Sequence, residues 1–76
     1  MVHDIQFPGR PEWEHKLFAQ EQKFIAASHA VLDVMAANAS DAVIRSAKAA
    51  FDTEMLLRDR LKAEGIAKAA AWERNR

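Results

Sequence analysis

The chain has no cysteine and no tyrosine, and its 76 residues include only two glycines and two prolines. Without cysteine it can form no disulfide, no thiolate metal site and no thiol nucleophile. Acidic and basic side chains number 11 each, so the formal net charge is zero. No overall field therefore draws the chain to nucleic acid or to an anionic membrane.

Long apolar segments are also missing from the sequence. No apolar run approaches the roughly 18 residues that a helix needs to span a bilayer. The first residues lack the basic start and the apolar stretch of a signal peptide. These absences favour a small cytoplasmic domain, and nothing in the sequence indicates a cofactor.

Alanine is abundant, with 16 residues, and it is the best helix former because its side chain loses no rotamer freedom in a helix. The residues that break helices are confined to Pro8, Gly9 and Pro11 near the start and to Gly65 near the end. No segment shows the alternating pattern of a strand. The sequence therefore predicts an all-α protein.

The helix breakers divide the chain into an arm and one helical domain. Residues 1–10 read as an extended arm and residues 11–76 as the domain, because proline disfavours helical geometry in the residue before it. A first helix is expected at about 12–37 and a second at about 41–64, with Ser40 as the N-cap of the second. A short connection between two long helices predicts an antiparallel hairpin.

Gly65 is the expected end of the second helix. With a left-handed glycine at this position, the apolar contact of a Schellman motif would join Leu61 and Ile66. Residues 66–74 would then form a short third helix. The alternative is one continuous helix, because Trp72 lies only about 20° around the helix from Leu61 at 100° per residue.

The apolar side chains predict which helix faces are buried. On the first helix they cover an arc roughly 200° wide, about twice the stripe that one neighbouring helix covers. A single core in so small a chain also supplies only about 3–5 kcal/mol. We therefore expect two copies to associate as a homodimeric four-helix bundle. In a compatible rival arrangement, the third helix folds back and Trp72 covers the exposed flank.

Three charged residues fall inside these apolar faces: Glu21 on the first helix, and Glu54 and Arg58 on the second. In the predicted hairpin, position i is level with about position 77 minus i, so the three would meet in one layer. The neighbouring layer would contain Phe24 and Phe51. Arg58 would satisfy both carboxylates through its planar fork of donors. This buried polar layer is interpreted as fixing helix register, and the alternative is a pocket for a ligand or metal.

The motif Glu12-x-x-His15 matches half of the ligand set of carboxylate-bridged metal sites in helical bundles. Both side chains lie about 140–160° from the centre of the apolar arc, so they point to solvent. We interpret them as an ordinary solvated helix face, and His29 with Asp33 as a second surface pair. No metal ligand is assigned.

A partner would contact the apolar side chains that the hairpin leaves uncovered, together with aromatic residues near the arm. These residues are Phe7, Trp13, Phe18, Ile25, Leu32, Leu56 and Trp72. Phe7 and Trp13 either anchor the arm to the bundle or form a docking motif that orders when a partner binds.

The sequence contains no Gly-rich phosphate loop and no arrangement typical of a nucleophilic triad, so an enzyme is not expected. The favoured function is a non-enzymatic protein–protein interaction module: an adaptor, a regulator or an accessory subunit. One alternative is a metal- or small-ligand-binding bundle that uses Glu21 and Glu54. Another is weak nucleic-acid binding through the basic segment 58–76.

Overall fold

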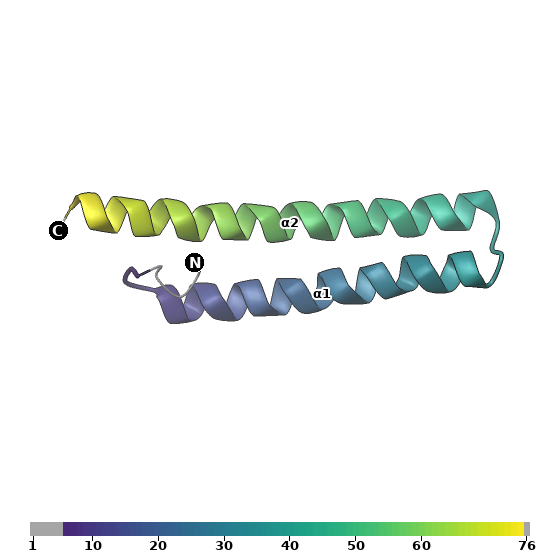
Figure 1. The fold of residues 1–76 in the computed structure, drawn as a ribbon, viewed down its shortest axis with the longest axis horizontal. Coiled ribbons are helices and arrows are strands. Elements are labelled where there is room, and N and C mark those ends of the chain that lie inside the picture. Colours follow the sequence, from purple (N-terminus) through teal and green to yellow (C-terminus); the bar gives the residue numbers. More distant parts are fainter. Residues whose placement is uncertain (1–5, 76) are drawn as a thin grey trace.

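The computed structural model describes residues 6–75, which form two helices: α1, Arg10–Ala36, and α2, Asp41–Arg74. The helices run antiparallel, side by side, in a rod of 55 × 18 × 15 Å (Figure 1). The predicted all-α hairpin is therefore confirmed. Neither of these two helices is apolar over the length that a membrane span requires. Residues 1–5, the first half of the predicted arm, lie outside the described residues.

The start of α1 is a turn rather than the end of an extended arm. The Arg10 N–H donates to the Phe7 carbonyl oxygen at 3.1 Å, and the Trp13 N–H donates to that of Gly9, also at 3.1 Å. Gly9 adopts a φ of 88°, a left-handed conformation that a side chain would disfavour. Pro11 occupies the first helical turn, where its missing N–H is not needed. This turn directs Phe7 back against the helix.

α1 ends in a Schellman motif centred on Asn38. The Ala39 N–H donates to the Val34 carbonyl oxygen at 3.0 Å, and the Asn38 N–H donates to that of Met35 at 3.2 Å. Asn38 has a φ of 54°, a conformation that asparagine tolerates better than most residues. Ser40 then caps α2, because its Oγ accepts a hydrogen bond from the Val43 N–H at 3.4 Å. The predicted break and N-cap are thus confirmed.

The prediction that the second helix stops at Gly65 is wrong, and so is the prediction of a third helix. α2 continues through Gly65 to Arg74. Gly65 is buried because the Trp13 ring of α1 lies directly on it, and a Cβ there would overlap the indole atoms Cε2 and Cζ2. The indole Nε1–H donates to the Leu61 carbonyl oxygen at 2.6 Å. The glycine therefore permits a close approach between helices rather than ending one.

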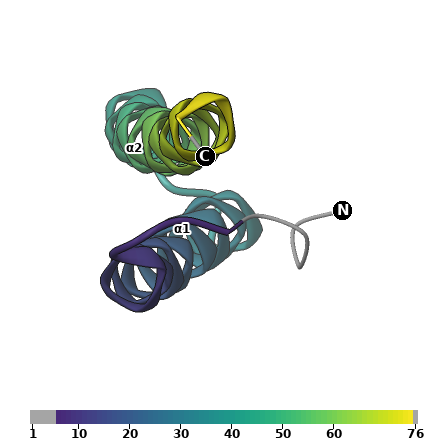
Figure 2. The same ribbon diagram turned by 90° about the vertical axis from the view of Figure 1, so that its left-hand side faces the viewer.

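The interface between α1 and α2 forms a thin core. Trp13 and Phe7 are its buried apolar residues, with ring centroids 5.7 Å apart in an edge-to-face arrangement. Phe24 and Phe51 meet at 5.1 Å, as the predicted pairing requires. Within residues 6–75 no side chain is removed entirely from water. Figure 2 shows the reason: among residues 6–75, two helices lie side by side and no third helix covers them.

We predict that Gly65→Ala destabilises the protein. Alanine raises helix propensity by about 1 kcal/mol, but its methyl group overlaps the Trp13 ring, and such overpacking costs about 1–3 kcal/mol. The expected net loss in the free energy of unfolding is about 1 kcal/mol, measured by urea denaturation followed by circular dichroism.

A Trp13→Ala background provides the control. Without the indole ring, Gly65→Ala should become stabilising by about 1 kcal/mol, because only the propensity gain remains. Equal effects of Gly65→Ala in both backgrounds would show that the ring does not constrain this position.

Candidate functional site

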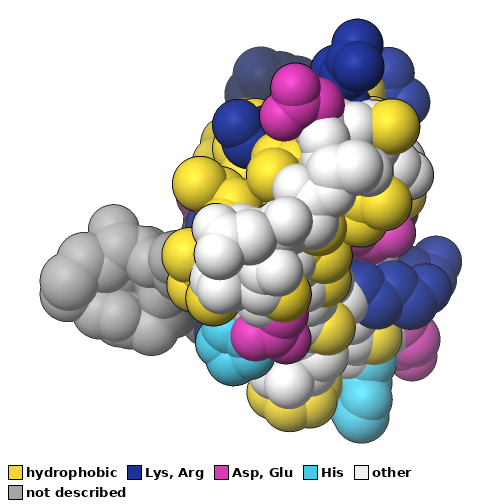
Figure 3. Space-filling model, turned by 90° about the vertical axis from the view of Figure 1, so that its right-hand side faces the viewer, with side chains coloured by type: hydrophobic (Ala, Val, Ile, Leu, Met, Phe, Trp, Pro, Cys, Tyr) yellow, Lys and Arg dark blue, Asp and Glu magenta, His cyan; other side chains and the backbone are white. Residues whose placement is uncertain are grey.

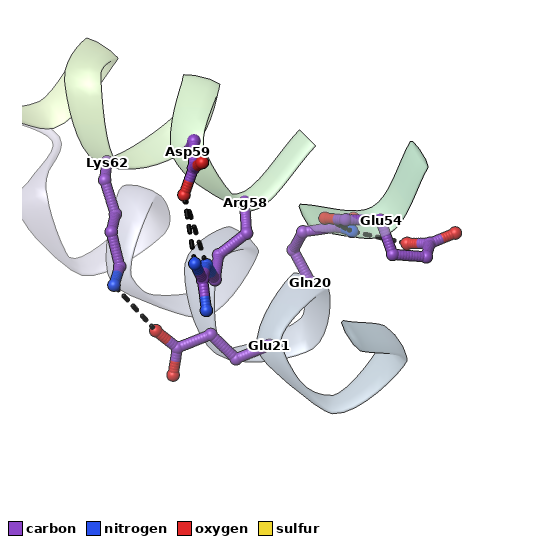
Figure 4. A network of polar contacts seen from close by, with 6 residues as sticks. All are labelled: Gln20, Glu21, Glu54, Arg58, Asp59 and Lys62. Atoms are coloured by element: carbon purple, nitrogen blue, oxygen red, sulfur yellow. Dashed lines mark hydrogen bonds and ion pairs between the residues drawn. The ribbon is translucent and has the colours of Figure 1, made fainter. Parts of the chain in front are cut away.

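Gln20 is the centre of the polar cluster between the helices. Its side chain is buried, with only 8% of its surface exposed. Its Nε2–H₂ group donates to the Glu54 backbone carbonyl oxygen at 3.1 Å and to Oε2 of the Glu54 carboxylate (Figure 4). One amide on α1 thus donates hydrogen bonds to both the backbone and the side chain of Glu54 on α2.

Arg58 does not join the two carboxylates as the sequence predicted. Its guanidinium lies over the Phe24 ring, 4.3 Å from the centroid, and donates to Asp59 Oδ1 from Nε at 3.3 Å and from Nη2 at 3.1 Å. Glu21 is paired instead with Lys62, at 4.0 Å between Oε1 and Nζ. Figure 4 shows that the three carboxylates have different partners: Lys62 for Glu21, Arg58 for Asp59 and Gln20 for Glu54.

The different pairing follows from the part of α1 that faces α2. The residues that pack on α2 include Trp13, Gln20, Phe24 and Val31, which lie within about 40° of one another at 100° per residue. Glu21 is roughly 80° from the centre of this group. The average direction of all apolar residues of α1 lies nearer to Glu21, which is why the sequence predicted a different pairing.

Two charges of the cluster face an opposite charge, Glu21 at Lys62 and Arg58 at Asp59, and Glu54 accepts a hydrogen bond from the neutral amide of Gln20. Glu21, Glu54 and Arg58 are each half-buried, and each has a polar or charged partner. In the part of the chain that the structure describes, no three side chains of the types that ligate metals gather in one place. Glu12 and His15 are exposed. The arrangement supports register and orientation of the helices, and no observation favours a ligand at this cluster.

Three cations of the basic C-terminal segment, Arg58, Lys62 and Lys68, lie close to acidic groups. Lys68 Nζ lies 2.8 Å from Glu64 Oε1, and this hydrogen-bonded ammonium lowers the pKa of the Glu64 carboxyl below its ordinary value. Arg58 and Lys62 contact acidic groups as described above. These three cations are therefore partly neutralised, which disfavours them as a phosphate-binding surface.

The apolar surface is the other candidate site. Phe18, Ile25 and Leu32 form one line along α1, with 65%, 44% and 61% of their surfaces exposed. Other large apolar side chains are also exposed: Met35, Val43, Leu56, Leu57, Ile66 and Trp72. Figure 3, which views the end that carries the connecting turn, shows hydrophobic atoms reaching the surface among scattered charges.

Two of the residues predicted for the interaction surface are placed differently. Phe7 and Trp13 are buried against each other and against α2 rather than presented to a partner. Their anchoring role was one of the two interpretations offered by the sequence. The remaining five residues of that predicted surface are exposed.

Two grooves accompany the exposed side chains. One, of about 310 Å³, lies between the helices and is lined by Ser28, Val31, Leu32, Lys48, Phe51 and Asp52. The other, of similar volume, lies at the open end and is lined by Phe7, Pro8, Lys68, Ala71, Trp72 and Asn75. The sequence did not reveal them, because each depends on which flank of one helix faces the other. The first groove shares Leu32 with the exposed line on α1.

Comparison of the chain with protein-family models, with curated proteins and with solved structures finds no match.

We predict that the two partners in the polar cluster respond unequally to substitution. Gln20→Leu removes the donor to Glu54 and leaves a half-buried carboxylate unpaired, which should cost about 1–3 kcal/mol of unfolding free energy. Glu54→Gln should cost clearly less, because an amide oxygen still accepts the Gln20 N–H. Urea denaturation of both variants measures the difference, and a larger loss for Glu54→Gln would contradict this assignment.

Proposed function

We propose that the protein is a non-enzymatic protein–protein interaction module that acts as a homodimer of helical hairpins, associated as a four-helix bundle. The observation that supports this proposal is the exposed apolar line of Phe18, Ile25 and Leu32 on α1. A stable monomer seldom leaves a contiguous row of large apolar side chains in water, and such rows are typical of protein interfaces.

The total surface area supports the same conclusion. The chain exposes 5596 Å², whereas a compact globular protein of 8.5 kDa exposes about 4,700 Å². The surplus is similar to the roughly 800 Å² that each partner contributes to a standard interface. A second copy could cover this surface, because α2 packs on another face of α1 and leaves the line exposed.

Charge does not oppose self-association. The formal net charge is zero, so two copies do not repel each other through their overall fields. The exposed line itself contains no charged residue. Within a dimer these side chains would leave water at a gain of about 25 cal/mol for each Å² of apolar surface buried.

We expect the wild-type protein to sediment at equilibrium as a species of twice 8.5 kDa at micromolar concentration. Leu32→Lys should weaken association at least tenfold, because it places a charge in the apolar line. Leu56→Lys, at a position on the far side of α2 that is also more than half exposed, is the control and should remain dimeric. A wild-type monomer with full helical content would rule out the homodimer.

A further inference from the structure

We propose that the two copies join through α1 itself, as an antiparallel α1–α1 pair whose twofold axis passes beside Ile25. The occupant of the exposed line is thus the same line of a second copy. This inference rests on the proposed dimerisation, and it adds the surface, the direction and the register of the contact.

The spacing of the exposed line is symmetric about its central residue. Phe18 and Leu32 each lie seven residues from Ile25, or about 10.5 Å along the helix at 1.5 Å per residue. In an antiparallel pair, Ile25 would meet Ile25 of the partner subunit. Phe18 would meet the partner's Leu32, and Leu32 would meet Phe18 of the partner subunit. A large and a medium side chain then share each outer layer, and every exposed residue of the line is covered.

The polar residues beside the line match in the same register. Glu21 and Ser28 lie on the side of the line that is nearer α2, and Gln22 and His29 lie on the other side. A twofold axis perpendicular to the helices places each side against the same side of the partner. Glu21 is then level with the partner's Ser28, whose hydroxyl can donate to the carboxylate, and Gln22 is level with the partner's His29. No two like charges face each other.

A contact between the two α2 helices fits less well. The flank of α2 nearest the exposed line carries Lys48, Asp52, Asp59 and Lys62, arranged around Met55. An antiparallel pairing about Met55 would place Lys48 level with the partner's Lys62 and Asp52 level with the partner's Asp59. Both pairs repel, so charge favours α1 as the contact helix.

The hairpin geometry favours the antiparallel direction over the parallel one. The Glu21–Lys62 pair and the groove that joins Ser28 to Lys48 show that α2 lies on the Glu21 side of the exposed line. An antiparallel pair keeps both α2 helices on the same side, so that the two grooves open toward each other. A parallel pair would place the α2 helices on opposite sides and leave both grooves open.

Cysteine cross-linking tests this register, because an introduced cysteine is the only thiol in the chain. Helices that pack about 8–10 Å apart, with Cα atoms at a radius of about 2.3 Å, bring facing Cα atoms to about 3.4–5.4 Å. The upper part of that range suits a disulfide. Residue 18 and its own copy would instead be about 21 Å apart along the helices, out of reach of a disulfide.

The experiment oxidises full-length Ile25→Cys, Phe18→Cys and Leu32→Cys separately at a concentration where the wild type is dimeric. Ile25→Cys should become a covalent dimer in most molecules, whereas the other two variants alone should not. An equal mixture of Phe18→Cys and Leu32→Cys should form the mixed disulfide. Leu56→Cys, on the outer face of α2, is the control and should stay uncrosslinked. All four positions are substantially exposed in the single hairpin, so the substitutions should preserve its fold.

A charge-pairing experiment provides a second readout that needs no oxidation. Phe18→Glu and Leu32→Lys should each sediment as monomers when alone, and an equal mixture should recover a heterodimer. Recovery requires the two substituted positions to face each other, as the antiparallel register states.

The outcomes separate this inference from the dimer proposal. Cross-linking of Phe18→Cys with itself would indicate a parallel pair and overturn the register. A dimeric wild type in which Leu56→Cys cross-links and Ile25→Cys does not would move the contact to α2 and leave the proposed function standing. A monomeric wild type would remove both proposals together.

Discussion

The contact of the Trp13 indole with Gly65 is the constraint on which the rest of the hairpin depends. The ring occupies the space that a Cβ at position 65 would need, and its N–H donates a hydrogen bond to the Leu61 carbonyl oxygen at 2.6 Å. These two contacts fix both the distance between the helices and their relative position along the rod. That position places Gln20 against Glu54 in the next part of the interface. One bulky residue and one residue without a side chain thus determine the register.

Local sequence signals were sufficient where structure is determined by neighbouring residues. The connecting turn, the Ser40 N-cap and the antiparallel pairing of Phe24 with Phe51 followed from short-range chemistry and helical spacing. The role of Gly65 did not follow. A glycine can end a helix or allow another helix to pack closely on it, depending on what contacts it. Here the contact is with Trp13, which is 52 positions away in the sequence. No local pattern carries that information.

The sequence predicted where the polar cluster lies but not which of its residues pair with each other. Charges on apolar faces indicated that Glu21, Glu54 and Arg58 would lie between the helices, and the structure places all three there, half-buried. Their partners were mispredicted because the wide apolar arc of α1 serves two purposes. One part packs on α2, and the other forms the exposed line containing Ile25. Averaging over both parts shifted the expected centre of the interface and concealed the role of Gln20.

The hairpin connectivity has a consequence for the order in which the molecule can assemble. The Trp13–Leu61 hydrogen bond spans 48 positions, and the Gln20–Glu54 bond, which spans 34, is nested inside it. Once the Gln20–Glu54 bond has formed, the Trp13–Leu61 bond lengthens the closed segment only from 34 to 48 positions, so the further entropy lost is small. Such nesting is typical of rapid folding. Trp13, which packs at the end of the hairpin farthest from the turn, would then be among the last side chains to form its native contacts.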